Sequence, residues 1–214
     1  MNISDCKQCT RLSCFLQSVK SQYPDYHALP VGAFGDAAAK LLIVGLAPGM
    51  HGANRTGRPF TGDYAGILLY KTLHQYGFAT RPESVAATDD LQLIGCRITN
   101  AVKCLPPDNK PIPKEIKQCN RYLATELDQF VHNGGTAVLA LGTIAHQAVL
   151  MGLQLKAKDY PFAHGAVHQL NQNNQIGNGL RLYDSYHCSR YNTQTKRLTT
   201  EMFEQVFTRI VADF

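Results

Sequence analysis

Cysteine is the residue type whose spacing in this chain most directly suggests chemistry. Of seven cysteines, Cys6 and Cys9 form a C-x-x-C pair, Cys104 follows an apolar run, and Cys119 lies fifteen positions further on. A close pair plus two single thiolates can complete a tetrahedral metal site. A zinc ribbon more often has two C-x-x-C pairs, so the wide spacing of Cys104 and Cys119 favours an iron–sulfur cluster. The alternative is that Cys104 and Cys119 are small buried core residues, which is common for free cysteine.

The other cysteines do not indicate a disulfide framework. The chain has seven cysteines in all, an odd number that cannot pair completely. The N-terminal MNISDCKQC lacks the pattern of a signal peptide, so we expect an intracellular, cytoplasmic protein, in which disulfides are rare. Cys14 competes with the N-terminal pair as a ligand, Cys96 suits a strand in the core, and Cys188 belongs to a later motif.

A second candidate site is the segment GLAPGMHGANRTGRPFTGD, residues 45–63, which follows the apolar run KLLIV. A glycine-rich turn between a strand and a helix is typical of an anion-binding loop. This one is longer than a P-loop or a dinucleotide-binding turn and lacks both motifs. Because His51, Asn54, Arg55 and Arg58 fall within eight residues, we favour a binding site for an anionic or planar group over a purely structural connection.

The elements that must position these residues alternate along the chain. Buried strands are predicted at 41–46, 96–102, 136–142 and 180–186, and helices at 6–21, 64–76, 113–132, 143–152 and 198–214. Residues 156–179 are predicted to be irregular. The alternation predicts one α/β domain over residues 1–214, with a parallel sheet of four strands between helical layers.

Ligand sites in such folds form at the carboxyl ends of the strands. The polar loops that begin at Gly45, Asn100, Gly142 and His187 are therefore expected to converge on one edge. A lone asparagine or histidine is usually a structural residue, but polar loops at several strand ends favour a site.

Composition limits the partners. The chain has 214 residues and a net charge of +5, which is compatible with a polyanionic partner but is weak evidence for one. No apolar run approaches the ~20 residues of a membrane span, so a membrane protein is excluded.

Several segments together resemble a known family: DCKQC, the 45–63 loop, ITNAVKCLPPDNKPIP, ALGTIAHQAVL and HCSRYNTQTKRLT. They resemble the iron–sulfur uracil-DNA glycosylases, and the family 5 (type B) branch more than family 4. The resemblance implies a three-layer α/β/α sandwich with a four-stranded parallel sheet. It also implies a structural [4Fe–4S] cluster held by Cys6, Cys9, Cys104 and Cys119.

The resemblance implies a reaction as well: hydrolysis of the N-glycosidic bond of uracil in DNA, with hypoxanthine and other deaminated bases as further candidates. The product would be an abasic site in base excision repair, and the base would first be flipped out of the stack. Phe60 would stack on the base, Asn100 would bind its Watson–Crick edge, and His187 would stabilise the departing anion. Gly45 and Ala47 would line the base pocket.

Asp63 would be the catalytic carboxylate. Family 4 enzymes carry a glutamate where this chain has Leu46, and the family 5 pattern instead uses the aspartate of F-T-G-D. The alternative is that Asp63 is simply the N-cap of the following helix. The chain departs from the usual His-Pro-Ser motif because Cys188 replaces the proline, which removes a fixed φ from that loop.

The DNA-binding residues follow from the same resemblance. Arg190, Tyr191 and Asn192 would enter the duplex where the base leaves. Candidate phosphate contacts are Arg55, Arg58, Lys196 and Arg197, and the alternative for each is a solvated surface charge. We expect a monomer that acts on double- or single-stranded DNA near the nucleoid. Two alternatives remain: a non-catalytic nucleic-acid-binding module with the same fold and cluster, and a redox or nucleotide-handling α/β protein.

Overall fold

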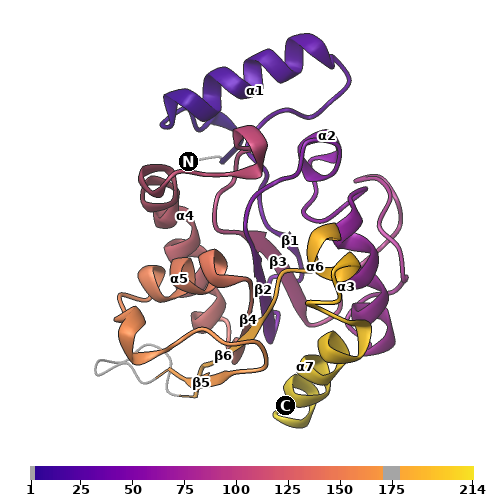
Figure 1. Ribbon diagram of the computed structural model, residues 1–214, viewed down its shortest axis with the longest axis vertical. Helices are drawn as coiled ribbons and strands as arrows, with labels where there is room; N and C mark the ends of the chain where they lie inside the picture. Colours follow the sequence, from indigo (N-terminus) through magenta and orange to yellow (C-terminus); the bar gives the residue numbers. More distant parts are fainter. Residues whose placement is uncertain (1–2, 171–178) are drawn as a thin grey trace.

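The computed structural model describes residues 3–170 and 179–214 and places a twisted sheet between two layers of helices (Figure 1). The N-terminal helix lies at one end of the molecule, and the C-terminus lies at the other end (Figure 1). Within the described ranges, no helix is both long enough and apolar enough to cross a membrane.

Four parallel strands form the centre of the sheet, in the order β3-β2-β4-β6. They are β2 (Leu41–Gly45), β3 (Cys96–Asn100), β4 (Ala137–Leu141) and β6 (Arg181–Ser185). All four were predicted, and each is one or two residues shorter than its apolar run. Because the central strands are covered on both faces, the sequences of β2 and β4 are continuously apolar rather than alternating.

The sheet has two further strands that the sequence did not predict, so the expected count of four is wrong. Strand β1 (Phe34–Gly35) pairs antiparallel with β3, and β5 (Val167–Gln169) pairs antiparallel with β6. Strands of two and three residues are too short to show a recognisable pattern. Strand β5 falls in the segment predicted to be irregular, of which residues 171–178 lie outside the described chain.

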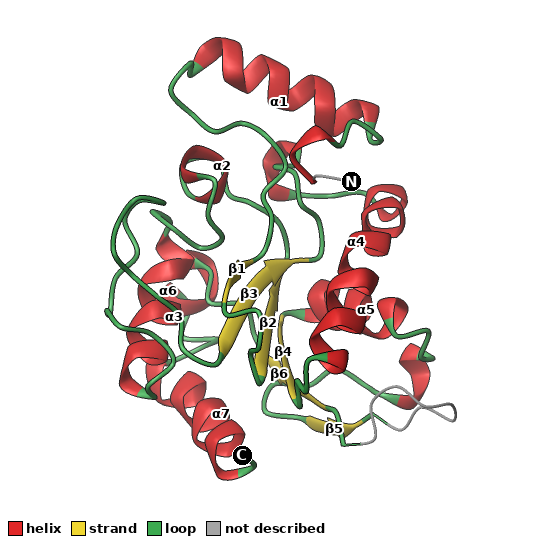
Figure 2. Cartoon of the chain, turned by 180° about the vertical axis from the view of Figure 1, so that it is seen from behind, coloured by secondary structure: helices red, strands yellow, loops and turns green. Residues whose placement is uncertain are grey.

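The two faces of the sheet are covered by different helix pairs (Figure 2). Helices α3 (Tyr64–Gln75) and α7 (Thr200–Ala212) cover one face, and α4 (Pro113–His132) and α5 (Thr143–Gly152) cover the other. Successive side chains of a strand point to opposite faces, and within β2 Ile43 accordingly packs in one core while its neighbours pack in the other. The predicted three-layer arrangement is confirmed.

Helix α1 (Thr10–Gln22) lies outside the sandwich, across one end of the molecule (Figure 1). It begins four residues later than predicted, and its Leu12, Leu16 and Val19 pack on a third apolar cluster that includes Val102. This third cluster connects the N-terminal segment to the loop that follows β3.

The loops contain short helices that the sequence pattern did not reveal. They are α2 (Ala53–Thr56), α6 (Arg190–Gln194) and the 3₁₀ turns at Ile3–Asp5, Pro107–Asn109 and Ala157–Asp159. A helix of one turn carries too few residues to show a 3.6-residue period. Helices α2 and α6 both fall in segments expected to bind a ligand.

Candidate active site

The carboxyl ends of the central strands meet at one cleft of about 420 Å³. It is lined by Leu46, Ala47, Gly49, Ala53, Phe60, Asp63, Tyr64, Ala65, Asn100, Asn109, His187, Ser189 and Arg190. The expected convergence of the loops after β2, β3 and β6 is therefore observed. The loop at Gly142 reaches the same edge, where its N–H donates to the carbonyl of Ser185 at 2.8 Å.

Gly45 determines the floor of this cleft. It ends β2 and pairs in register with Asn100 at the end of β3. A Cβ at position 45 would lie 2.5 Å from Asn100 Oδ1 and 2.5 Å from Phe60 Cζ. No ordinary side chain fits there, so the absence of one allows the aromatic ring and the amide to share the floor.

Asn100 carries an unsatisfied acceptor. Only 2% of the residue is exposed, and its Oδ1 has no hydrogen-bond partner among the described residues. An unpaired buried polar atom costs about 1–3 kcal/mol, so such atoms are rare in folded proteins. The oxygen faces a cleft in which a ligand donor could satisfy it.

Phe60 and His187 lie next to each other in the cleft. Their ring centroids are 6.0 Å apart and the planes are inclined by 28°. Phe60 adopts φ = 54°, a left-handed conformation that is unusual for an aromatic residue and is found mostly where function requires it. Burial lowers the pKa of His187 to about 4, so its imidazole is neutral at neutral pH.

Asp63 is the only acidic residue among the described residues that line the cleft. Its side chain caps α3, because Oδ1 accepts a hydrogen bond from the Gly66 N–H at 2.9 Å. The predicted N-cap role is confirmed. Burial raises the pKa of Asp63 above its usual value. Leu46 lines the same cleft and supplies no carboxylate.

Gly52 makes room for this carboxylate, and the sequence did not single it out. A Cβ at position 52 would lie 2.4 Å from Asp63 Cβ and 2.5 Å from Asp63 Oδ2. Tyr64, Asn109 and Ser189 are further lining residues that were not predicted. Tyr64 is the first residue of α3 and directly follows Asp63. This position next to a predicted site residue is the one sequence signal that could have indicated that Tyr64 lines the cleft.

The rim of the cleft carries exposed cationic and aromatic side chains. The guanidinium of Arg190 lies 5.4 Å from the ring centroid of Tyr64, a cation–π contact. Tyr191 is 70% exposed, and Arg55 is exposed with its Nε bonded to the carbonyl of His51 at 2.7 Å. Asn192 is engaged within the chain, because its Nδ2 donates to the carbonyl of His187 at 2.8 Å.

The predicted phosphate contact at Arg58 is wrong. Arg58 is only 4% exposed, and its guanidinium pairs with Asp89 at 2.6 Å and lies 4.8 Å from the ring centroid of Phe34. Burial alone would raise the pKa of Asp89, but hydrogen bonds from Arg58 and from backbone amides lower it to about 2. Arg58 stabilises the loop from inside and is too buried to contact DNA.

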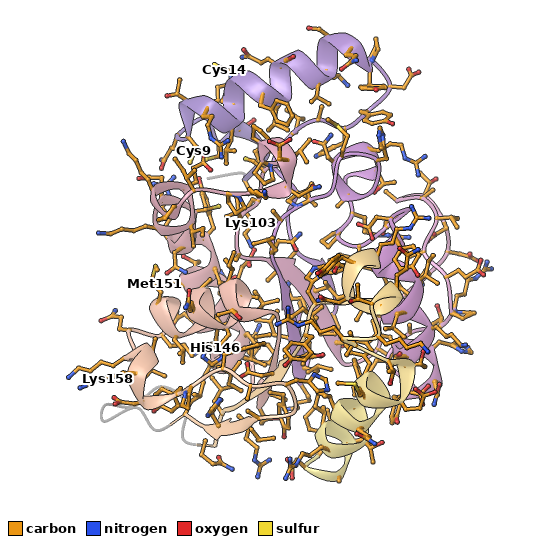
Figure 3. The ribbon with its side chains drawn as sticks, in the orientation of Figure 1. Cys9, Cys14, Lys103, His146, Met151 and Lys158 are labelled. Carbon is orange, nitrogen blue, oxygen red and sulfur yellow. The ribbon has the colours of Figure 1, made fainter. Side chains whose placement is uncertain are left out.

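The four cysteines expected to bind metal line one small cavity beneath α1. Cys104 and Cys119 are buried, and Cys6 and Cys9 are partly exposed (Figure 3 labels Cys9). Burial, together with neighbouring thiols, raises the pKa of Cys104 to about 12, and burial raises that of Cys119 to about 11. Such thiols ionise readily only beside a strong positive charge. Cys14 is exposed and lies outside the cavity, whereas Cys96 is in the core as predicted.

Known proteins resemble this chain in sequence over most of its length. The family model for the uracil DNA glycosylase superfamily matches residues 33–211, and the chain belongs to this superfamily. Within it, the chain is 44% identical over 209 residues to a type-5 uracil-DNA glycosylase of Thermus thermophilus, which covers 95% of this chain and 91% of the relative.

Two other relatives show how the similarity is distributed. A type-5 uracil-DNA glycosylase of Pyrobaculum aerophilum is 39% identical over 213 residues, covering 98% of this chain and 89% of the relative. A type-4 uracil-DNA glycosylase of Archaeoglobus fulgidus is 29% identical over 175 residues, covering 81% and 74%. The expected greater similarity to type 5 than to type 4 is confirmed by these relatives.

Replacing Arg58 should affect stability rather than DNA affinity. We expect Arg58→Ala to lower the free energy of unfolding by about 3–5 kcal/mol, because it leaves the Asp89 carboxylate without its partner. Urea denaturation measures this change. Arg55→Ala is the matched control, and its stability should stay within about 0.5 kcal/mol of the parent because the side chain is exposed. Equal stability of the two variants would contradict the structural role of Arg58.

Proposed function

We propose that this protein is a monofunctional uracil-DNA glycosylase that hydrolyses the N-glycosidic bond of uracil in DNA and leaves an abasic site for base excision repair. The observation that carries the proposal is the unsatisfied Oδ1 of Asn100, which is buried in a cleft beside an aromatic ring. The relatives named type-5 uracil-DNA glycosylase support the same substrate.

Recognition of the base uses the floor of the cleft. Asn100 Oδ1 accepts from N3–H of a flipped uracil and Nδ2 donates to its O4, which together satisfy both halves of the amide. Cytosine has no N3–H and presents an amino group in place of O4, so it would leave the amide unpaired. The ring of Phe60 stacks on the face of the base. Ala47 lines the cleft and supplies backbone that the base can approach closely, whereas Gly45 lies against Phe60 and Asn100.

Departure of the base is assisted by His187. Its low pKa keeps the imidazole neutral, so the ring acts as a hydrogen-bond donor to O2 of the base and not as a proton source. As the glycosidic bond breaks, negative charge develops on the base, and a hydrogen bond that strengthens with this charge lowers the barrier. Asn192 holds the backbone of His187 in place.

Asp63 acts on the sugar side of the bond. Its carboxylate either orients the attacking water or stabilises the positive charge that develops on the deoxyribose. Oδ1 stays hydrogen-bonded to the Gly66 N–H in the first turn of α3, and this bond fixes the orientation of Oδ2. No lysine lines the cleft among the described residues, which agrees with hydrolysis without a Schiff base.

DNA contacts come from the rim. We assign Arg190 and Tyr191 to the position where the base leaves the duplex, because both are exposed beside the cleft. Insertion of an apolar or aromatic side chain into the stack offsets the cost of flipping. Arg55 supplies a phosphate contact.

The cysteine cavity fits a [4Fe–4S] cluster better than a single zinc ion. Tetrahedral zinc holds its sulfur ligands about 3.8 Å apart. Within the described chain, no three of the four sulfurs lie within 4.8 Å of one another. A cubane cluster binds each thiolate to a different iron and so requires wider spacing. The Lys103 N–H also donates to Cys119 Sγ at 3.3 Å, a contact typical of cluster sites. The cluster's role would be structural, connecting Cys6 and Cys9 to the loop after β3.

Activity on a uracil-containing oligonucleotide tests the function. The cluster-loaded protein should convert U·G, U·A or single-stranded substrate into a product that alkali cleaves at the abasic site, and Asn100→Ala should reduce the rate by about 10²-fold or more. If none of the three substrates gives an alkali-labile product, the glycosylase function is disproved, and a non-catalytic DNA-binding module is the alternative. Binding of the same oligonucleotides would be measured in parallel.

Comparing two substitutions of Asp63 separates its roles. Because the folded-state pKa is raised, the ionised carboxylate costs stability at pH values above its ordinary 3.8. Asp63→Asn keeps an N-cap and removes that cost, so at pH 7 it should unfold at the same or a higher urea concentration while excision falls by about 10²-fold. Asp63→Ala should lose about 1 kcal/mol from the missing cap. Near-normal activity of Asp63→Asn would disprove the carboxylate role.

Removing one cysteine ligand tests the cluster. The purified protein should be brown, with absorbance near ~400 nm from iron–thiolate bonds, and Cys119→Ala should lose most of its iron and this absorbance. Cys14→Ser is the control and should retain both, because Cys14 lies outside the cavity. A colourless protein with stoichiometric zinc would count against the cluster.

A further inference from the structure

Two histidines and an aspartate meet in the interior, away from both the cleft and the cysteine cavity. They are His146 on α5, His168 on β5 and Asp184 on β6, and one ligand atom from each lies within 4.8 Å of the others. In Figure 3, Cys9 is labelled beside the N-terminal helix, whereas His146 is labelled nearer the middle of the molecule. Asp184 is fully buried, and the side chains of His146 and His168 are 2% and 13% exposed.

The hydrogen bonds of His146 fix its tautomer. Its Nε2 lies 2.8 Å from the carbonyl oxygen of Tyr160, which can only accept a hydrogen bond, so Nε2 carries a proton. Its Nδ1 lies 2.8 Å from Asp184 Oδ1. In a neutral imidazole this nitrogen presents a lone pair to a carboxylate oxygen. Two facing acceptors at this distance in a buried place repel each other, so the contact requires either a proton shared between them or a metal ion bound to both.

The surroundings match those of a metal ligand. A histidine that binds a metal through one nitrogen typically donates its other N–H to a backbone carbonyl, as His146 does to Tyr160. The second oxygen of Asp184 lies 3.2 Å from His168 Nε2, which provides a second imidazole on the other side of the carboxylate. Two imidazoles and one carboxylate form a common three-ligand set for a divalent transition metal.

We propose that His146 Nδ1, His168 Nε2 and Asp184 bind a Zn²⁺ ion. Bonds of ~2.1 Å in a tetrahedron place neighbouring ligand atoms about 3.4 Å apart. His146 Nδ1 lies 2.8 Å from Oδ1 of Asp184 and His168 Nε2 lies 3.2 Å from its Oδ2, so an ion bound by both imidazoles and this carboxylate requires these contacts to open by a few tenths of an ångström. The imidazole ligands disfavour Mg²⁺ and Ca²⁺, which prefer oxygen. A water molecule completes the coordination.

The ion has a structural effect near the active site. Its three ligands come from α5, the edge strand β5 and the central strand β6, so binding fastens the edge of the sheet to its centre. Asp184 lies three residues before His187 along the same chain. A fixed end of β6 holds the loop that positions His187, although the ion itself lies outside the cleft.

Metal content and thermal stability test the site in the cluster-loaded protein. After dialysis against a mild chelator, with retention of the ~400 nm absorbance as proof that the cluster is intact, one equivalent of Zn²⁺ should bind and raise the unfolding temperature. His168→Gln should abolish both effects. His74→Gln is the matched control, because His74 is exposed on α3 and should leave both effects unchanged.

Asp184→Asn provides a second variant that also should lose the bound zinc. If it fails to fold, His168→Gln still decides the question, because its side chain is partly exposed and its loss removes one ligand. Absence of zinc binding in the parent protein, or equal binding and equal thermal shift in parent and His168→Gln, would overturn the proposal. A hydrogen bond between His146 and Asp184 would then account for their contact.

Discussion

The absence of a side chain at Gly45 is the constraint on which the cleft depends. The end of β2 lies so close to Phe60 and Asn100 that a single added carbon would approach both to 2.5 Å. The loop from 45 to 63 must therefore turn back over the strand end, and Phe60 does so in a left-handed conformation. Asp63 follows three residues later and starts α3, so one close contact sets the place of the ring, the amide and the carboxylate.

Burial then gives each group its chemical state. The same exclusion of water that keeps His187 neutral also raises the pKa of Asp63 and of the thiols of Cys104 and Cys119. Neutral histidine is a good donor to an anion, whereas burial makes ionisation of the carboxylate and of the thiols less favourable, and a nearby positive charge offsets this effect. The neutral imidazole of His187 therefore suits a substrate that develops negative charge, and the buried thiols suit a bound metal.

Sequence patterns predicted the central strands, α3, α4, α5 and α7, because each is long enough to show its period. They failed for β1, β5 and α2, which carry too few residues for any period to show. Arg58 was misassigned because its partner Asp89 is 31 positions away, and nothing local distinguishes a buried guanidinium from a surface one. The contact between His146 and Asp184 spans 38 positions and was missed for the same reason.

The short outer strands β1 and β5 also govern how the sheet meets other molecules. A parallel sheet of buried, apolar strands is a strong template for pairing with another chain when its edge is open. Among the residues that the structure describes, each side of the four-strand centre ends in an antiparallel segment of only two or three residues. Such a border offers too few backbone groups to recruit a further strand, and the sheet is thereby protected against edge-to-edge aggregation.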